Sequence, residues 1–170
     1  MQAEIKKQEG LSLIEGLVIV GIIGLLGTLA AVALDSARER ARDAKRLADV
    51  VRVQAALELY FNDNNSYPVV EEATALGETA TGCLSSSGFE ASCDASSETV
   101  YMDPVPSTPE DGTQDLVACS NVASAYCYMG DEDTYRIEFE LENENPEAEL
   151  VAGVNCATET EVKAGNCEAL

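Results

Sequence analysis

The side chains of this chain that could do chemistry are carboxylates and thiols, because the sequence contains no histidine. Without histidine there is no Ser-His-Asp or Cys-His arrangement, and no glycine loop of the Walker or dinucleotide type is present. The chain has 31 Asp and Glu residues against 10 Lys and Arg. Neighbouring carboxylates are therefore expected by chance, and we do not expect an enzyme.

One carboxylate stands apart from the others. Glu15 is the only charged residue between Leu11 and Leu34. An apolar run of this length spans the ~30 Å hydrocarbon core of a bilayer as a helix. A carboxylate inside such a run is costly unless a partner neutralises it. Cleavage after Gly10 would create a cation nearby, the α-amino group of Leu11 in the same or a neighbouring copy, so the pattern predicts processing and self-assembly.

This N-terminus resembles that of the type IV pilins and of the pseudopilins of type II secretion. The resemblance rests on a short leader that ends in Gly10, on the apolar Leu11 that follows, on the position of Glu15, and on the unbroken apolar stretch. It implies cleavage between Gly10 and Leu11 by a prepilin peptidase, N-methylation of Leu11, and packing of the helix into a filament core. The implied partners are further copies of the chain, related pilins and an inner-membrane assembly machinery.

The expected organisation follows from this boundary. We predict a leader (1–10), a transmembrane or filament-core helix (11–34), an amphipathic helix (35–62) and an acidic globular head (63–170). The precursor would lie in the inner (cytoplasmic) membrane, and the assembled filament would be extracellular or periplasmic, with its heads outside the cytoplasm. A cleaved secretory signal or a plain membrane anchor is the simpler alternative. The polar helix continues without Pro or Gly between Thr28 and Asn62, which favours one long helix over a discarded signal.

The amphipathic part shows apolar residues at spacings of three, four and seven, as expected for a helix that lies on a core. The residues of this stripe are Leu47, Val50, Val51, Leu57, Tyr60 and Phe61. The cluster Asn62–Ser66, followed by Tyr67-Pro68, predicts the end of the helix. A Tyr-Pro junction after the helix also resembles the pilin family.

The head is predicted to be a loop-rich domain on a small antiparallel sheet, which gives an α+β fold. In Tyr135–Leu141 apolar residues alternate with charged ones, the pattern of a half-buried strand. Residues 125–129 are its expected partner across the turn Gly130–Asp133, and Leu150–Val154 is expected to contribute a third strand. The segment Glu71–Ser120 is expected to consist mainly of loops.

Six cysteines lie in the head, and none lies in the leader or the helix. Their even number and the absence of Cys-x-x-Cys spacing favour disulfides in an oxidising compartment over a zinc site. Six cysteines allow 15 pairings, and we predict the sequential one because it closes short loops. The predicted pairs are Cys83–Cys93, Cys119–Cys127 and Cys156–Cys167. Free thiols remain the alternative.

The charge is distributed unevenly along the chain. The formal net charge of −21 lies entirely in residues 61–170. Such a surface repels nucleic acid, so we expect no nucleic-acid partner; adaptation to a salty habitat would explain the same acidity. Five bases cluster between Arg38 and Arg46, outside the membrane, where basic residues are not usual. They could form ion pairs along the helix or with acidic heads of neighbouring subunits.

Two weaker signals concern ligands and helix packing. Asp131 and Asp133 lie in an acidic turn of the kind that calcium prefers, but the spacing does not match an EF-hand, and a solvated turn is the favoured interpretation. We therefore expect no cofactor. Gly21, Gly24 and Gly27 recur at a spacing of three in the apolar run. They favour close helix contact or local unwinding during assembly.

These observations predict a structural subunit, a type IV pilin that polymerises through its N-terminal helix into an extracellular filament. A pseudopilin of a type II secretion system is the first alternative, and a membrane-anchored binding module that never polymerises is the second.

Overall fold

The computed structural model describes residues 12–93, 99–107, 117–119, 122–124 and 126–167. The chain divides into two compact units, Met1–Arg38 and Glu39–Leu170. One helix, α1 (Leu13–Asn64), contributes residues to both units. We call the second unit, Glu39–Leu170, the head.

Helix α1 ends where the turn-forming residues begin. Asn65 has a left-handed backbone (φ 55°), and its N–H donates to the carbonyl of Phe61 at 2.7 Å. Asparagine tolerates this conformation better than most residues and often ends a helix in this way. The Asn64 side chain also donates to the carbonyl of Tyr60 at 2.9 Å. The predicted stop at Asn62–Ser66 is confirmed.

In the head, α1 buries one stripe of residues. The stripe consists of Arg46, Asp49, Val50, Val53, Ala56, Leu57 and Tyr60. The prediction that Val51 belongs to it is wrong, since Val51 is 52% exposed. Successive residues of a helix lie about 100° apart, so Val51 lies beside the stripe that Val50 joins. Val53 and Ala56 occupy the buried positions instead.

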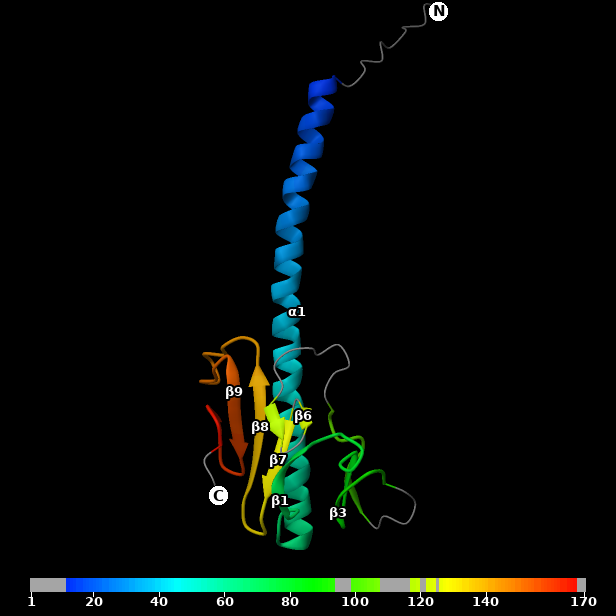
Figure 1. Ribbon diagram of the computed structural model, residues 1–170, viewed down its shortest axis with the longest axis vertical. Coiled ribbons are helices and arrows are strands. Elements are labelled where there is room, and N and C mark those ends of the chain that lie inside the picture. The colour runs from blue at the N-terminus through cyan, green and yellow to red at the C-terminus, as the bar shows by residue number, and fades with distance from the viewer. Residues whose placement is uncertain (1–11, 94–98, 108–116, 120–121, 125, 168–170) are drawn as a thin grey trace, which may run out of the picture. The chain divides into compact units, whose positions relative to one another are not determined.

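The main sheet of the head has five antiparallel strands in the order β1-β7-β8-β9-β10 (Figure 1). The strands are β1 (Val70–Ala75), β7 (Tyr126–Gly130), β8 (Tyr135–Leu141), β9 (Gly153–Thr158) and β10 (Val162–Ala164). The predicted hairpin is present as β7 and β8, with Tyr128 opposite Ile137. The third strand lies further along the chain than predicted, because Leu150 forms only an isolated bridge to Asn145 before β9 begins.

Two small sheets occupy part of the segment that was expected to consist mainly of loops. One has the order β3-β2-β4, with β2 (Cys83–Ser85), β3 (Gly88–Glu90) and β4 (Val100–Met102). The other pairs β5 (Val117–Cys119) with β6 (Val122–Ser124). The structure joins Cys83 to Cys93, Cys119 to Cys127, and Cys156 to Cys167. The segment is therefore held by short ladders and two of the three disulfides.

The core lies between the helix stripe and the buried face of the sheet, and it is rich in tyrosine. Val50, Val53 and Leu57 belong to the same buried cluster as Tyr126, Tyr128, Tyr135, Ile137 and Phe139. The buried hydroxyls have partners, because Tyr126 donates to Asp49 at 3.0 Å and Tyr128 to the carbonyl of Pro68 at 2.8 Å. Burial raises the pKa of both phenols. The chain therefore has the predicted α+β fold, with one long N-terminal helix, antiparallel sheets and three disulfides.

Candidate functional site

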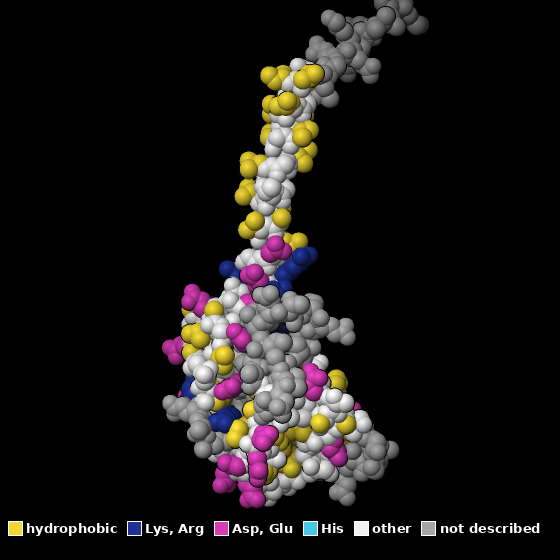
Figure 2. Space-filling model, in the orientation of Figure 1, with side chains coloured by type: hydrophobic (Ala, Val, Ile, Leu, Met, Phe, Trp, Pro, Cys, Tyr) yellow, Lys and Arg dark blue, Asp and Glu magenta, His cyan; other side chains and the backbone are white. Residues whose placement is uncertain are grey.

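Among the residues that the structure describes, none buries the apolar part of α1, and its apolar side chains are exposed on the face seen in Figure 2. Its large apolar side chains are between 45% and 87% exposed. They are Leu13, Ile14, Leu17, Val18, Ile19, Val20, Ile22, Ile23, Leu25, Leu26, Leu29, Val32 and Leu34. By length and composition this segment could cross a membrane. An apolar surface this large marks a site for lipid or for protein partners.

Glu15 lies in the first turn of this helix and is exposed. No ion pair to Glu15 is formed by the residues that the structure describes. The predicted cleavage site, Gly10 and Leu11, lies outside the described residues. The processing of this site and the proposed pairing of Glu15 with the new N-terminus therefore stay predictions.

The three spaced glycines have no packing role within the chain. A Cβ added at Gly21, Gly24 or Gly27 would meet no atom within 4 Å, and α1 continues through all three. Each glycine lowers helix stability by about 1 kcal/mol relative to alanine. Nothing in the described part of the chain requires this cost. The glycines' predicted roles in contact or unwinding concern a partner and stay predictions.

A single side-chain hydroxyl in this region is satisfied locally. Thr28 donates to the carbonyl of Leu25 at 2.8 Å. A hydroxyl bonded within its own helix can enter an apolar environment without losing a hydrogen bond. Glu15 therefore differs from Thr28, because burial of its carboxylate requires a partner outside the described residues.

The start of the head is fixed by a cluster of charged residues that we call the latch: Arg42, Asp43, Arg46, Glu142 and Asn143. Arg42 bonds both oxygens of the Glu142 carboxylate through its Nε and Nη2. Arg46 lies 3.6 Å from Glu142 and donates to the carbonyl of Glu140 at 3.1 Å. These contacts hold the pKa of Glu142 below its usual value, chiefly through the hydrogen bonds from Arg42. A bidentate guanidinium–carboxylate pair is among the stronger polar contacts in proteins.

Asp43 completes the latch by holding the chain that leaves β8. Its carboxylate accepts the backbone N–H groups of Glu142 at 2.8 Å and Asn143 at 2.9 Å. The Asn143 side chain donates to the same carboxylate at 3.0 Å. Three of the five clustered bases, Arg38, Arg42 and Arg46, are thus paired within their own subunit. The predicted ion pairs along the helix are confirmed for Asp35–Arg38, Asp43–Arg46 and Asp49–Arg52.

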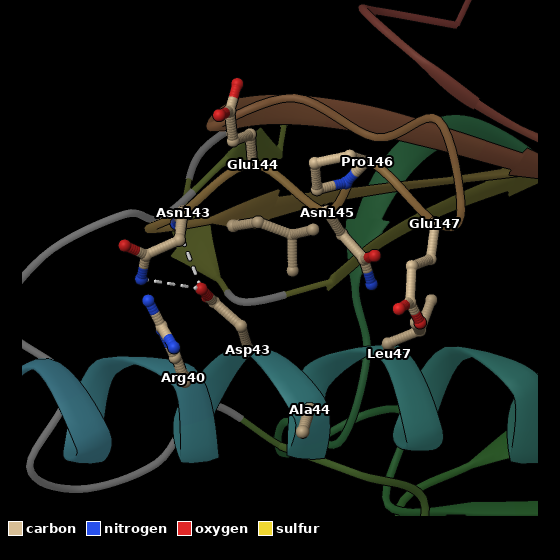
Figure 3. A pocket seen from close by; sticks show the side chains of 10 residues that line it. Arg40, Asp43, Ala44, Leu47, Asn143, Glu144, Asn145, Pro146 and Glu147 are labelled. Atoms are coloured by element: carbon tan, nitrogen blue, oxygen red, sulfur yellow. Dashed lines mark hydrogen bonds between the residues drawn. The ribbon is translucent and has the colours of Figure 1, made fainter.

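Beside the latch is a groove of about 630 Å³ between α1 and the β8–β9 loop (Figure 3). Arg40, Asp43, Ala44 and Leu47 line it from the helix, and Leu141 and Asn143–Glu147 line it from the loop. Arg40 lies on the same side as Asn143, and Glu147 lies above Leu47 (Figure 3). The groove has mixed polar and apolar walls and no arrangement of a nucleophile with a base.

The acidic turn considered for calcium uses its first carboxylate locally. Asp131 accepts the N–H groups of Asp133 and Thr134, both at 2.8 Å. These backbone bonds lower the pKa of Asp131. The carboxylate therefore stabilises the β7–β8 turn, as an aspartate commonly does. Among the described residues, no group of three candidate ligands for a metal is present.

Sequence reasoning missed the role of the latch, although a signal was present. Arg46 and Asp49 fall on the same helical stripe as Val50, Val53 and Leu57. A base and an acid at buried positions of an amphipathic helix imply polar partners on the facing element. The partner residue, Glu142, could not be named because it lies about a hundred residues away in the sequence.

Comparison with known proteins adds an independent finding. No protein-family model matches the chain, and no solved structure matches it significantly. The chain is similar to type II secretion system core protein G of Aeromonas hydrophila, with 36% identity over 67 residues. The protein of the same name from Escherichia coli K12 is 36% identical over 66 residues, and that from Vibrio cholerae is 33% identical over 69 residues.

The match covers part of each protein. It spans 39% of this chain and 47% of the Aeromonas protein, 39% and 46% for Escherichia coli, and 41% and 47% for Vibrio cholerae. The chain thus spans about half the length of the curated relatives it matches. These relatives confirm the resemblance to the pilin and pseudopilin family, and their name points to the secretion branch of it.

Proposed function

We propose that this chain is a pseudopilin-like structural subunit, which is cleaved after Gly10 and polymerises through its apolar helix. The observation that carries the proposal is the uncovered segment Leu13–Leu34, in which Glu15 is the one charged residue. A helix that served only as a lipid anchor would have no use for an acid near its start, because the carboxylate is costly there.

The assembled state would satisfy both features of this segment. Helices of neighbouring copies would cover the apolar surface, and the freed amino group of Leu11 would neutralise Glu15. The latch also supports the proposal, because it fixes the first helix residues of the head to the chain that leaves β8.

The secretion role is favoured over a surface pilus by the similarity to core protein G of type II secretion systems. The exposed helix and the relatives fit membrane anchoring, with the head on the periplasmic side. We propose no catalytic role, because the sequence contains no histidine and no nucleotide-binding glycine loop. The partners would be further copies, related pseudopilins, a prepilin peptidase and an inner-membrane machinery.

Two measurements on the native chain test this proposal. Intact-mass analysis of membrane material should show a chain that begins at Leu11 and carries an added methyl group, and a chain that retains Met1 would contradict processing. Negative-stain microscopy of sheared cells and of isolated membranes should show filaments. A processed chain without filaments would indicate an anchored binding module, and loss of protein secretion in a deletion strain would separate a pseudopilus from a surface pilus.

A further inference from the structure

The outer face of α1 in the head carries exposed bases that the latch does not use. Arg40 and Lys45 are exposed, and within the described ranges neither forms an ion pair. At 3.6 residues per turn they lie about 140° apart, at the two borders of one helix face. The residues between them on this face, Ala41, Ala44 and Ala48, are also exposed. We call these five residues the basic face.

The basic face is open to a large partner because its centre consists of alanines. Their short side chains leave both flanking cations accessible, and small residues permit another surface to approach the helix closely. On one side Arg40 borders the groove, where Glu144 and Glu147 lie on the opposite wall. A carboxylate partner must therefore approach from the side of Ala41 and Ala48, which do not line the groove.

The opposite end of the head carries the complementary charge. Glu71 and Glu72 are exposed on β1, and Glu132 and Asp133 are exposed in the β7–β8 turn. The two pairs are close, because Val70 pairs with Gly130 in the sheet. We call these four residues the acidic end. Figure 2 shows Lys and Arg side chains on the helix where the head begins and a group of Asp and Glu side chains at the other end of the head.

These two surfaces cannot meet within one chain. The acidic end lies at the C-terminal end of α1, since Tyr67 donates its N–H to the carbonyl of Glu132 at 3.0 Å. From Lys45 to Asn64 the helix rises by about 28 Å, at 1.5 Å per residue. That separation exceeds the Debye length of about 8 Å at physiological ionic strength. The basic face and the acidic end of one chain therefore form no ion pairs with each other and interact only weakly.

We propose that the basic face of one copy binds the acidic end of the head of another copy in the assembled filament. The inference rests on the proposed polymerisation and adds the surfaces through which the heads meet. Contact between two different surfaces of the same chain is head-to-tail and generates an open helical polymer when the rotation does not close. The contact also supplies attraction between subunits that each carry a net charge of −21.

Carbodiimide coupling tests this contact, because the reagent joins an ammonium to a carboxylate only when the two touch. After cleavage at Gly10 the chain has two lysines, Lys45 and Lys163. Lys163 lies 3.2 Å from Glu161 and serves as the reaction control within one chain. In filaments mixed from isotopically labelled and unlabelled copies, we expect Lys45 linked between chains to a peptide of the acidic end. Lys45→Arg keeps the charge but has no ammonium for the reagent to couple, so filaments of this variant should lack this link.

Charge reversal supplies the matched functional test. Arg40→Glu with Lys45→Glu should lower filament yield by about tenfold, a loss equivalent to about 1.4 kcal/mol. Adding Glu71→Lys and Glu72→Lys to the same chain should restore the yield, while Lys163→Glu should change nothing. The head of the variant with Arg40→Glu and Lys45→Glu should keep the wild-type melting temperature, because neither Arg40 nor Lys45 has an ion-pair partner among the described residues.

The outcomes separate this inference from the proposed function. Wild-type filaments without interchain links at Lys45, or normal assembly of the reversed variant, would overturn the contact and leave polymerisation standing. A reversed variant that assembles normally but leaves the membrane more readily would assign the basic face to anionic lipid headgroups. Absence of wild-type filaments would overturn both proposals.

Discussion

Helix α1 is used in two different ways along its length. From Leu13 to Leu34 its apolar side chains are all exposed, whereas from Arg46 to Tyr60 every third or fourth residue is buried against the sheet. In the head, α1 packs against tyrosines and aliphatic residues of the sheet and is also bound to it through the latch. In the apolar segment, no residue of the described part of the chain packs against the helix. From this difference we predict that the head folds without help from the apolar segment.

The largest effect on assembly should come from Glu15, the acid in the apolar segment of α1. Glu15→Gln removes the charge that we expect to pair with the amino group of Leu11, so filament yield should fall by tenfold or more, equivalent to at least about 1.4 kcal/mol. Membrane insertion should be unchanged or easier, because a neutral amide is less costly in the bilayer. Filament counts and membrane fractionation measure the two quantities.

Asp35→Asn is the matched control for this experiment. Asp35 is an exposed acid that already pairs with Arg38 at 3.6 Å. Its neutralisation should leave assembly close to normal. Equal filament yields from wild type and Glu15→Gln would show that the acid has no part in assembly.

Reduction of the disulfides should destabilise the head and leave the apolar segment of α1 intact. The three disulfides close loops with sequence separations of 8 to 11 residues, all in the head. Each loop of this size stabilises the folded state by about 2–3 kcal/mol. A chain lacking Met1–Leu34 should resist proteolysis when oxidised and become cleavable between Glu71 and Ser120 when reduced.

Calcium supplies the control in the proteolysis assay. The Asp131 carboxylate is occupied by two backbone N–H groups, so calcium should change the cleavage rate little. Equal protease resistance of the reduced and oxidised forms would show that the disulfides do not stabilise the head. Strong protection by calcium alone would instead make the Asp131–Asp133 turn a metal site.

Breaking the latch should destabilise the head less than reducing all three disulfides. Glu142→Gln leaves Arg42 and Arg46 without their shared carboxylate and should lower the free energy of unfolding at pH 7 by about 2–3 kcal/mol. Because the pKa of Glu142 is lowered in the folded state, its contribution is present above the unfolded pKa of about 4.3 and is lost as the pH falls through the folded pKa. Denaturant unfolding across this pH range measures the effect.

Glu144→Gln is the neighbouring control. Glu144 is exposed on the wall of the groove, and its neutralisation should change the unfolding free energy by less than about 0.5 kcal/mol. The difference between wild type and Glu142→Gln should shrink as the pH falls below about 4. A difference that persists at low pH would mean that packing, and not the carboxylate charge, stabilises this region.

The smallest effect should come from the spaced glycines. Gly24→Ala has room in the isolated chain and should stabilise the helix by about 1 kcal/mol, as circular dichroism of the detergent-solubilised chain can show. If the glycines serve contact or unwinding in the filament, the same change should reduce assembly modestly. Gain in both helicity and assembly would remove any special role for Gly21–Gly27. Thr28→Ala, which removes only a local hydrogen bond, is the control.

The predictable parts of the fold are those with a local signature. The alternation in Tyr135–Leu141 and the asparagine cluster after Phe61 each reflect one element's own geometry. Strand β9 was placed too early because its buried residue Asn155 breaks the apolar pattern. That side chain bonds the backbone of Val151 and Gly153 and so stabilises the loop before the strand. Contacts over long separations, such as Arg42 with Glu142, leave no periodic signal in the sequence.

In the candidate site too, features with a local signal could be predicted from the sequence and long-range contacts could not. Glu15 and the glycines could be predicted as site residues because their signal is local. Each is unusual within an apolar helix, Glu15 for its charge and the glycines for their lack of a side chain. The pairing within the basic cluster could not be named. Arg40 and Arg42 are two residues apart and look equivalent in the sequence. In the structure, however, Arg42 is bound to Glu142, whereas Arg40 is exposed at the edge of the groove.

A helical reconstruction of filaments purified from sheared membranes tests the central claim most directly. We predict that the segment Leu13–Leu34 of each copy is buried against the same segment of neighbouring copies, with the Glu15 carboxylate beside the N-terminus of Leu11. Any break in the helix should fall between Gly21 and Gly27, and the heads should lie outside. A map in which the apolar helices do not contact one another, or purified assemblies that hold the helix only in lipid or detergent, would contradict the account.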